Sequence, residues 1–171
     1  PETSNLYPEL TCFENLLFAG RLYGMNSEKA KTKADALLEL FGLKEKRDVL
    51  FAKLSSGMKR RLTMAASLIH DPPVLFLDEP TTGLDVMSAR ALREIMQSLK
   101  NRGITILLTT HYIEEADRLC DRIAITVKGR IIAIDTPNAL KKSVSADNPS
   151  LEDAFVEITG LQSDLMFQEK R

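Results

Sequence analysis

The sequence predicts an α/β fold in which a mostly helical N-terminal region precedes a parallel sheet. Two short apolar runs, Val74 to Leu77 and Ile104 to Thr109, flank an amphipathic helical pattern over 87–101. Continuous apolar runs of this length are typical of strands that are buried on both faces. The order strand, helix, strand at this spacing predicts two parallel strands joined by a right-handed crossover.

Helical signals dominate the region before the first predicted strand. Thr11 and Glu14 have the spacing of a capping box, which predicts a helix over 11–24. A second helical pattern stops at Gly42, and the Ser55-Ser56 pair predicts the start of a third helix.

The region after the second predicted strand is expected to form a hairpin and a helical tail. Two further strands, Ile123 to Val127 and Arg130 to Ile134, are joined by Lys128-Gly129, which is a two-residue hairpin signal. We therefore divide the chain into a helical subdomain (1–72), a sheet core (73–135) and a C-terminal helical tail (136–171).

Composition narrows the possible partners. The 23 basic and 24 acidic residues give a net charge of −1, so no global attraction to nucleic acid or anionic lipid is expected. The two cysteines, Cys12 and Cys120, lack C-x-x-C spacing and are expected to be small buried thiols.

Two carboxylates, Asp78 and Glu79, follow the first predicted strand. Open α/β sheets bind ligands at the carboxyl ends of their strands. One carboxylate there can hold Mg²⁺, and the next can orient or deprotonate an attacking water. The alternative is a solvated Asp-Glu-Pro turn after an ordinary core strand.

A single histidine, His111, lies two residues beyond the second predicted strand, at the same sheet edge. It can donate a hydrogen bond to a transferring phosphoryl group. A structural histidine is the alternative at this position.

Two helix starts offer further candidate ligand groups. Ser55, Ser56 and Gly57 open the third predicted helix, where hydroxyl groups and free backbone N–H groups can bind phosphate. Gly83-Leu84-Asp85 opens the next helix and has the composition of a turn and cap. Simple capping explains either segment alone. The Lys59-Arg60-Arg61 run can add attraction for phosphate, but a charge run of this kind is more typical of a solvated face.

Taken together and in this order, these motifs resemble the nucleotide-binding domain of ATP-binding-cassette (ABC) transporters. Leu54 to Met58 resembles the signature motif, with Ser56 and Met58 in place of the commoner Gly and Gln. Val74 to Glu79 resembles the Walker B strand, and Gly83-Leu84-Asp85 resembles the D-loop. The resemblance implies a P-loop NTPase-like parallel sheet core with a helical subdomain.

The resemblance also implies site roles with ATP and Mg²⁺ as cofactors. Asp78 would hold Mg²⁺, Glu79 would act as general base and His111, at the switch-histidine position, would sense the γ-phosphate. Glu2 stands where the Q-loop glutamine is expected, which changes the metal and water coordination expected there.

A dimer with a second ATP-binding domain, either identical or different, is implied as well. Ser55 and Gly57 would contact the γ-phosphate of the opposite subunit, with Ser56 in the same nucleotide-binding segment, and Asp85 would couple the two sites. A transmembrane permease subunit would contact the surface around Leu6–Glu9 from the membrane, with the chain peripheral at its cytoplasmic face.

Export is favoured over import because the tail from Pro149 to Phe155 resembles those of drug- and antibiotic-export ATPases. An ABC-type ATPase of DNA repair is disfavoured by the near-zero net charge, so no nucleic acid partner is expected. The alternative function is a truncated, non-catalytic module that docks on a membrane subunit.

One family motif, the phosphate-binding loop G-x-x-x-x-G-K-[ST] (Walker A), does not occur in the 171 residues. The first strands of the core are expected to be missing with it, and Pro1 resembles a cut end near the Q-loop.

We therefore expect the 171-residue chain alone to bind ATP weakly and to hydrolyse none. Without this loop the β- and γ-phosphates lose their main donors and Mg²⁺ loses a ligand. An apolar sheet face normally covered by the missing strands should also make the chain prone to association. Measurable Mg-ATP turnover by the purified chain would contradict this expectation.

Overall fold

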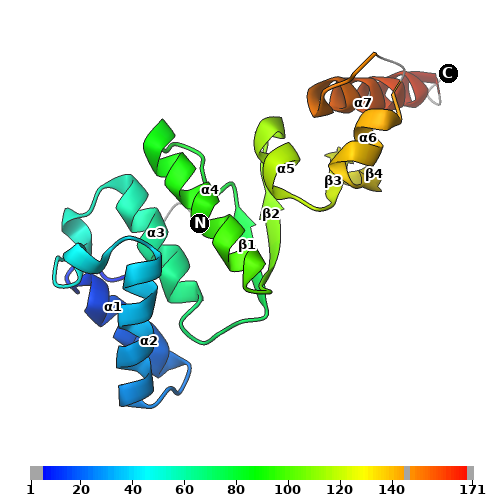
Figure 1. Cartoon of the computed structure of the whole chain (residues 1–171). Helices are drawn as coiled ribbons and strands as arrows, with labels where there is room; N and C mark the ends of the chain where they lie inside the picture. Colours follow the sequence, from blue (N-terminus) through cyan, green and yellow to red (C-terminus); the bar gives the residue numbers. More distant parts are fainter. Residues whose placement is uncertain (1–5, 145–146, 169–171) are drawn as a thin grey trace. The chain divides into compact units, whose positions relative to one another are not determined.

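A computed structural model of the chain describes residues 6–144 and 147–168, with side chains described to Gly160 (Figure 1). Its contacts divide it into two units, of which the first ends at Thr109 and the second starts at Thr110. Each unit packs around buried apolar side chains of its own.

Three helices with polar caps begin the first unit, as predicted. In the capping box, the Thr11 N–H donates to Glu14 Oε2 over 2.8 Å and the Glu14 N–H donates to Thr11 Oγ1 over 3.1 Å. Asn26 and Ser55 cap the next two helices. The elements are α1 (Cys12–Leu22), α2 (Ser27–Leu40), two 3₁₀ turns η1 (Lys44–Lys46) and η2 (Phe51–Lys53), and α3 (Ser56–Ser67).

Aliphatic and small side chains fill the space between these helices. Gly20 lets α1 and α2 approach closely, because a Cβ at this position would lie 3.2 Å from the Ala30 Cβ. Cys12 is buried as predicted, whereas Cys120 of the second unit is only half-buried. In this helical region, the largest fully buried aliphatic and aromatic side chains are Leu16, Leu38, Phe41, Leu43, Leu62 and Ile69.

The segment before α1 is fixed by Asn15, whose side chain is 1% exposed. Its Oδ1 accepts a hydrogen bond from the Tyr7 N–H over 2.8 Å. Its Nδ2 lies 3.1, 3.2 and 3.0 Å from the carbonyl oxygens of Tyr7, Leu10 and Thr11. The Tyr7 ring also meets the Phe18 ring edge to face, with centroids 4.8 Å apart. A single buried amide therefore sets the path of this segment.

The predicted strand–helix–strand unit is confirmed. The two strands are parallel, with Leu75 opposite Ile106 and Asp78 opposite Thr109. Its elements are β1 (Val74–Asp78), α4 (Val86–Asn101) and β2 (Thr105–Thr109), and the buried side of α4 carries Ala89, Leu92, Ile95, Met96 and Leu99.

In the described part of the chain these strands are buried on one face only, so the prediction of two buried faces does not hold here, whereas the expectation of an uncovered apolar sheet face does. Leu75 and Leu77 are buried, but Phe76 on the opposite face of β1 is 72% exposed and Leu107 of β2 is 57% exposed. An apolar run indicates that its side chains favour a buried environment, but it does not identify the element that covers them. Among the described residues, no element covers Phe76 and Leu107.

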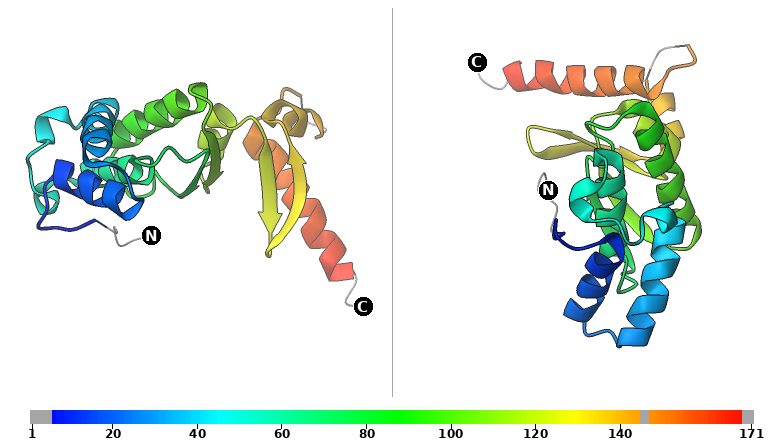
Figure 2. Two further views of the ribbon diagram at one scale, coloured as in Figure 1. Left: turned by 90° about the horizontal axis from the view of Figure 1, so that it is seen from below. Right: turned by 90° about the vertical axis from the view of Figure 1, so that its left-hand side faces the viewer.

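The second unit is built on an antiparallel hairpin, visible as the two yellow strands in Figure 2. Lys128 and Gly129 form the predicted turn, and both have positive φ (48° and 76°) as a type I′ turn requires. Ile125, Leu140 and Leu151 form the core of this unit. The elements are α5 (Ile113–Leu119), β3 (Ile123–Val127), β4 (Arg130–Asp135), α6 (Pro137–Lys142) and α7 (Leu151–Gln168).

No helix in the described ranges is both long and apolar enough to cross a bilayer.

The starts of α3 and α4 touch within the first unit. Gly57, in the first turn of α3, is buried against Ser88 in the first turn of α4. A Cβ at position 57 would lie 2.4 Å from the Ser88 Oγ and 2.7 Å from its Cβ. Glycine is therefore required here by close packing.

Substitution of Gly57→Ala should destabilise the protein by about 1–3 kcal/mol, because α3 and α4 must separate to admit the methyl group. Chemical denaturation measures the loss. Addition of Ser88→Gly removes the clashing side chain and should recover part of it.

The matched control is Gly160→Ala on α7, where a Cβ would meet no atom within 4 Å. This change should be neutral or stabilising by up to about 1 kcal/mol, since alanine favours a helix interior. Equal denaturation midpoints for Gly57→Ala and the unmodified protein would contradict the close packing described here.

Candidate functional site

Asp78 ends β1, at the carboxyl edge of the parallel pair. Its side chain is exposed, and its Oδ1 accepts a hydrogen bond from the Thr109 hydroxyl. Thr109 is also the residue opposite Asp78 in the strand register. The parallel pairing therefore orients this carboxylate toward solvent at the strand ends.

Glu79 follows with a left-handed backbone, at φ 42°. Residues other than glycine persist in this region only where surrounding contacts hold them. The Glu79 N–H donates to the Thr109 carbonyl over 3.0 Å and lies 3.2 Å from its hydroxyl oxygen. The side chain is half-buried, and its Oε2 accepts a hydrogen bond from Thr82 Oγ1 over 3.1 Å. Both the backbone and the carboxylate of Glu79 are thus fixed.

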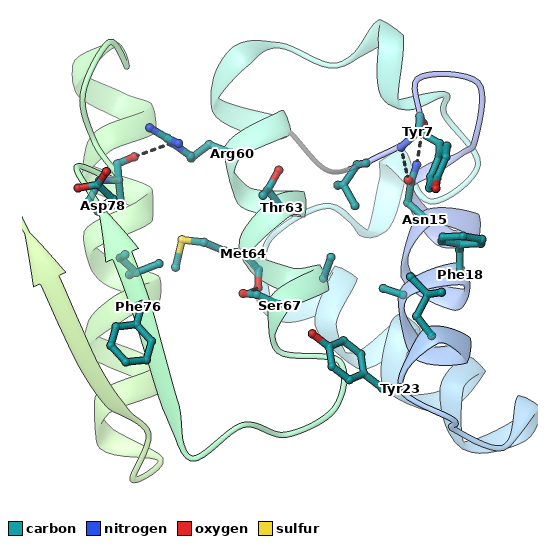
Figure 3. Close-up of a pocket in the computed structure, with 16 residues that line it drawn as sticks. Tyr7, Asn15, Phe18, Tyr23, Arg60, Thr63, Met64, Ser67, Phe76 and Asp78 are labelled. Carbon is teal, nitrogen blue, oxygen red and sulfur yellow. Dashed lines mark hydrogen bonds between the residues drawn. The ribbon is translucent and has the colours of Figure 1, made fainter. Parts of the chain in front are cut away.

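Arg60 extends from α3 toward this strand end (Figure 3). Its Nε donates to the Pro80 carbonyl over 3.1 Å and its Nη2 donates to the Glu79 carbonyl over 3.2 Å. Arg60 was predicted to lie on a solvated charged face, and these two hydrogen bonds correct that prediction. No local signal identifies these contacts, because the partners lie 19 and 20 positions further along the chain.

The candidate phosphate-binding segment lies at the N-terminus of α3. The Ser55 Oγ accepts a hydrogen bond from the Met58 N–H over 3.3 Å and so caps the helix. Ser55 and Ser56 are exposed, whereas Gly57 is buried. The exposed residues Ser55 and Ser56 thus present hydroxyl groups at a helix end whose dipole favours anions.

Asp85 caps α4 with both carboxylate oxygens. Its Oδ2 accepts from the Ser88 hydroxyl over 2.6 Å and its Oδ1 accepts from the Ser88 N–H over 2.9 Å. The hydroxyl contact, followed by the N–H contact, holds the pKa of Asp85 below its usual value. Since Ser88 also packs on Gly57, Asp85 and the start of α3 belong to one packed cluster.

His111 belongs to the second unit, while Asp78, Glu79, Asp85 and the start of α3 belong to the first. Its ring lies against Tyr112 with the centroids 4.2 Å apart. Glu2, the residue predicted at the Q-loop position, lies outside the described residues.

An open groove of about 790 Å³ lies beside the strand end within the first unit (Figure 3). Phe76 and Asp78 line it from β1, and Met64 lines it from α3. Phe18 of α1 and Tyr23, which directly follows α1, line the other side. The exposed side of β1 described above therefore forms one wall of this groove.

The described side chains include no cluster of three or more histidine, cysteine or acidic residues that could hold a metal ion. Mg²⁺ in nucleotide sites commonly takes one or two carboxylates, with phosphate oxygens and water as its other ligands. Asp78 supplies one exposed carboxylate at the strand end. The residues present thus fit a Mg²⁺ ion that binds together with a nucleotide.

Comparison with a protein-family model gives a match over residues 14–117, to the family described as "AAA domain, putative AbiEii toxin, Type IV TA system".

Curated relatives match more of the chain. Nod factor export ATP-binding protein I of Burkholderia lata is 50% identical over 143 residues, which cover 84% of this chain and 47% of the relative. The protein of the same name from Rhizobium etli is 49% identical over 140 residues, with 82% and 44% covered. The chain therefore spans about half the length of the curated relatives it matches.

Solved structures agree with these relatives. An ATP-binding subunit of an ABC transporter superposes with a TM-score of 0.78 at 34% identity, covering 93% of this chain and 66% of that chain. The cbiO1 protein of Clostridium perfringens, part of the ABC transporter complex cbiONQ, gives a TM-score of 0.73 at 28% identity, with 80% and 54% covered. These matches confirm the predicted α/β, P-loop NTPase-like fold class. The chain belongs to the family of ABC transporter ATP-binding domains.

Proposed function

We propose that this chain is the part of an ABC transporter ATP-binding subunit that positions and cleaves the γ-phosphate of ATP to drive export. The observation that carries this proposal is the pair of carboxylates at the end of β1, with Asp78 bonded to Thr109 and Glu79 bonded to Thr82. Two fixed carboxylates at the carboxyl edge of a parallel sheet suit phosphoryl transfer. The export named in its relatives supports the direction of transport.

In this proposal Glu79 is the general base. Its carboxylate accepts a proton from a water whose oxygen attacks the γ-phosphorus. The bond between the γ-phosphorus and the β,γ-bridging oxygen breaks, and that oxygen leaves as part of ADP. Thr82 orients the carboxylate through its 3.1 Å hydrogen bond. Asp78 would hold Mg²⁺, which when bound neutralises charge on the phosphate oxygens.

Two further residues are assigned to this nucleotide. His111 would donate a hydrogen bond to the transferring phosphoryl group, where charge develops. Glu2 would stand at the Q-loop position in place of a glutamine, so metal and water coordination at this loop would differ from that of the family.

The start of α3 would bind the nucleotide held by a second ATP-binding domain. Ser55, Ser56 and Gly57 form a helix N-terminus with exposed hydroxyl groups, which suits a phosphate group. Asp85 would couple the two sites, since it lies in one packed cluster with Gly57 through Ser88. An identical or a different second domain satisfies this arrangement.

The segment before α1 is the proposed contact with a transmembrane permease subunit, which would place the chain peripherally at the cytoplasmic face of a membrane. Tyr7 within it is 42% exposed, and Asn15 holds the backbone from the inside. A fixed backbone with exposed side chains gives a preformed surface for a partner.

In the full-length protein, Glu79→Gln should lower the kcat for ATP hydrolysis at least a hundredfold, because glutamine cannot accept the proton. ATP binding should persist, since the phosphate and Mg²⁺ contacts remain. Phosphate release and equilibrium nucleotide binding measure the two effects separately.

Glu94→Gln on the exposed side of α4 is the matched control, since it makes the same change in charge and loses only a surface pair with Arg90. Its kcat should equal that of the unmodified protein. Full activity in Glu79→Gln would exclude Glu79 as the base. Absence of hydrolysis in the unmodified full-length protein would favour the alternative of a non-catalytic docking module.

A further inference from the structure

Three adjacent cations at the start of α3 point to different partners. The Lys59 Nζ lies 5.5 Å from the centroid of the Phe51 ring. The Arg61 Nη1 donates to the Phe41 carbonyl over 2.9 Å, within the helical part of the unit. Arg60 instead reaches the end of β1. The positive charge that Arg60 shares with Lys59 and Arg61 therefore does not explain its two hydrogen bonds.

The two carbonyl groups that Arg60 contacts belong to consecutive residues, Glu79 and Pro80, and the first of them is part of the peptide bond that follows Glu79. The Glu79 carbonyl also accepts the Thr82 N–H over 3.2 Å, and the Glu79 N–H is held by the Thr109 carbonyl at 3.0 Å. Contacts thus fix the backbone of Glu79 on its N–H side through β2 and on its carbonyl side through Arg60. A left-handed residue keeps its conformation only when its surroundings fix it in this way.

We propose that Arg60 is a positioning residue that sets the place of the Glu79 carboxylate by holding the carbonyl groups of Glu79 and Pro80, which directly follow the Glu79 Cα. The proposal rests on the proposed function of Glu79. Arginine suits this task because its planar fork aims two N–H donors at neighbouring acceptors, whereas the single ammonium of lysine does not.

A second consequence concerns the segment Ser55–Gly57, which lies one turn before Arg60 on the same helix. A shift of α3 when that segment meets a phosphate would be passed directly to the Glu79 backbone through the Arg60 hydrogen bonds. The rigid helix and the two hydrogen bonds thus connect the candidate phosphate contact of one subunit to the base of the same subunit.

The test compares steady-state ATP hydrolysis by full-length variants. Arg60→Met removes both donors and should lower kcat about ten- to a hundredfold, the cost of a misplaced catalytic group, with the KM for Mg-ATP unchanged within about twofold. Arg60→Lys keeps the charge and should also lower kcat, by less. Lys59→Met makes the same change in charge as Arg60→Met at the neighbouring position and should keep kcat within about twofold.

Other results would overturn the inference. Raised KM with unchanged kcat in Arg60→Met would mean that Arg60 acts by attracting phosphate. If Arg60→Met fails to fold, an unchanged kcat in Arg60→Lys would equally contradict the positioning role.

Glu79→Gln separates this inference from the proposed function. In the Glu79→Gln background, Arg60→Met should cause no further loss of kcat and no change in ATP affinity, because its effect acts through Glu79. Loss of activity in Glu79→Gln with full activity in Arg60→Met would overturn the role of Arg60 alone. Full activity in Glu79→Gln would overturn the proposed function itself.

Discussion

The parallel register of β1 and β2 is the constraint on which the site depends. It places Thr109 opposite Asp78, so that one threonine bonds the Asp78 side chain and the Glu79 N–H. The chain must then turn sharply, and Glu79 takes a left-handed conformation that residues other than glycine rarely adopt. A strand pair that slipped by one residue would redirect both carboxylates, since side chains alternate between faces. The geometry of the carboxylates therefore follows from strand pairing.

Helix α3 adds the second constraint. Its first turn packs on Ser88 through Gly57, and its next turn reaches the strand end through Arg60. Two otherwise separate features, a helix start with exposed hydroxyl groups and a strand end with carboxylates, are thereby fixed to each other within the first unit. Neither contact contributes much apolar burial. Both contacts fix the positions of the candidate site residues, and phosphoryl transfer depends strongly on the positioning of the reacting groups.

Local signals in the sequence predicted much of the fold, because caps, turns and strand runs act over a few residues. The Thr11 capping box and the Lys128-Gly129 turn are examples, and both are confirmed. Contacts between segments far apart in the sequence could not be predicted from these local signals. Arg60 was assigned to a solvated face because nothing near it in sequence indicates the Glu79 carbonyl. The apolar run that contains Phe76 predicted a strand with two buried faces, but such a pattern does not identify what covers each face. The roles of the site residues remain proposals.

The buried amide of Asn15 has a mechanical consequence. It holds Tyr7 at both its N–H and its carbonyl, and it also lies within 3.2 Å of the Leu10 carbonyl. The segment from Tyr7 to Leu10 is therefore rigidly attached to α1. Any displacement of this segment must either break these hydrogen bonds or move the helix with it. A force applied at the exposed Tyr7 ring would therefore tilt α1, because these hydrogen bonds keep the segment before the helix from bending.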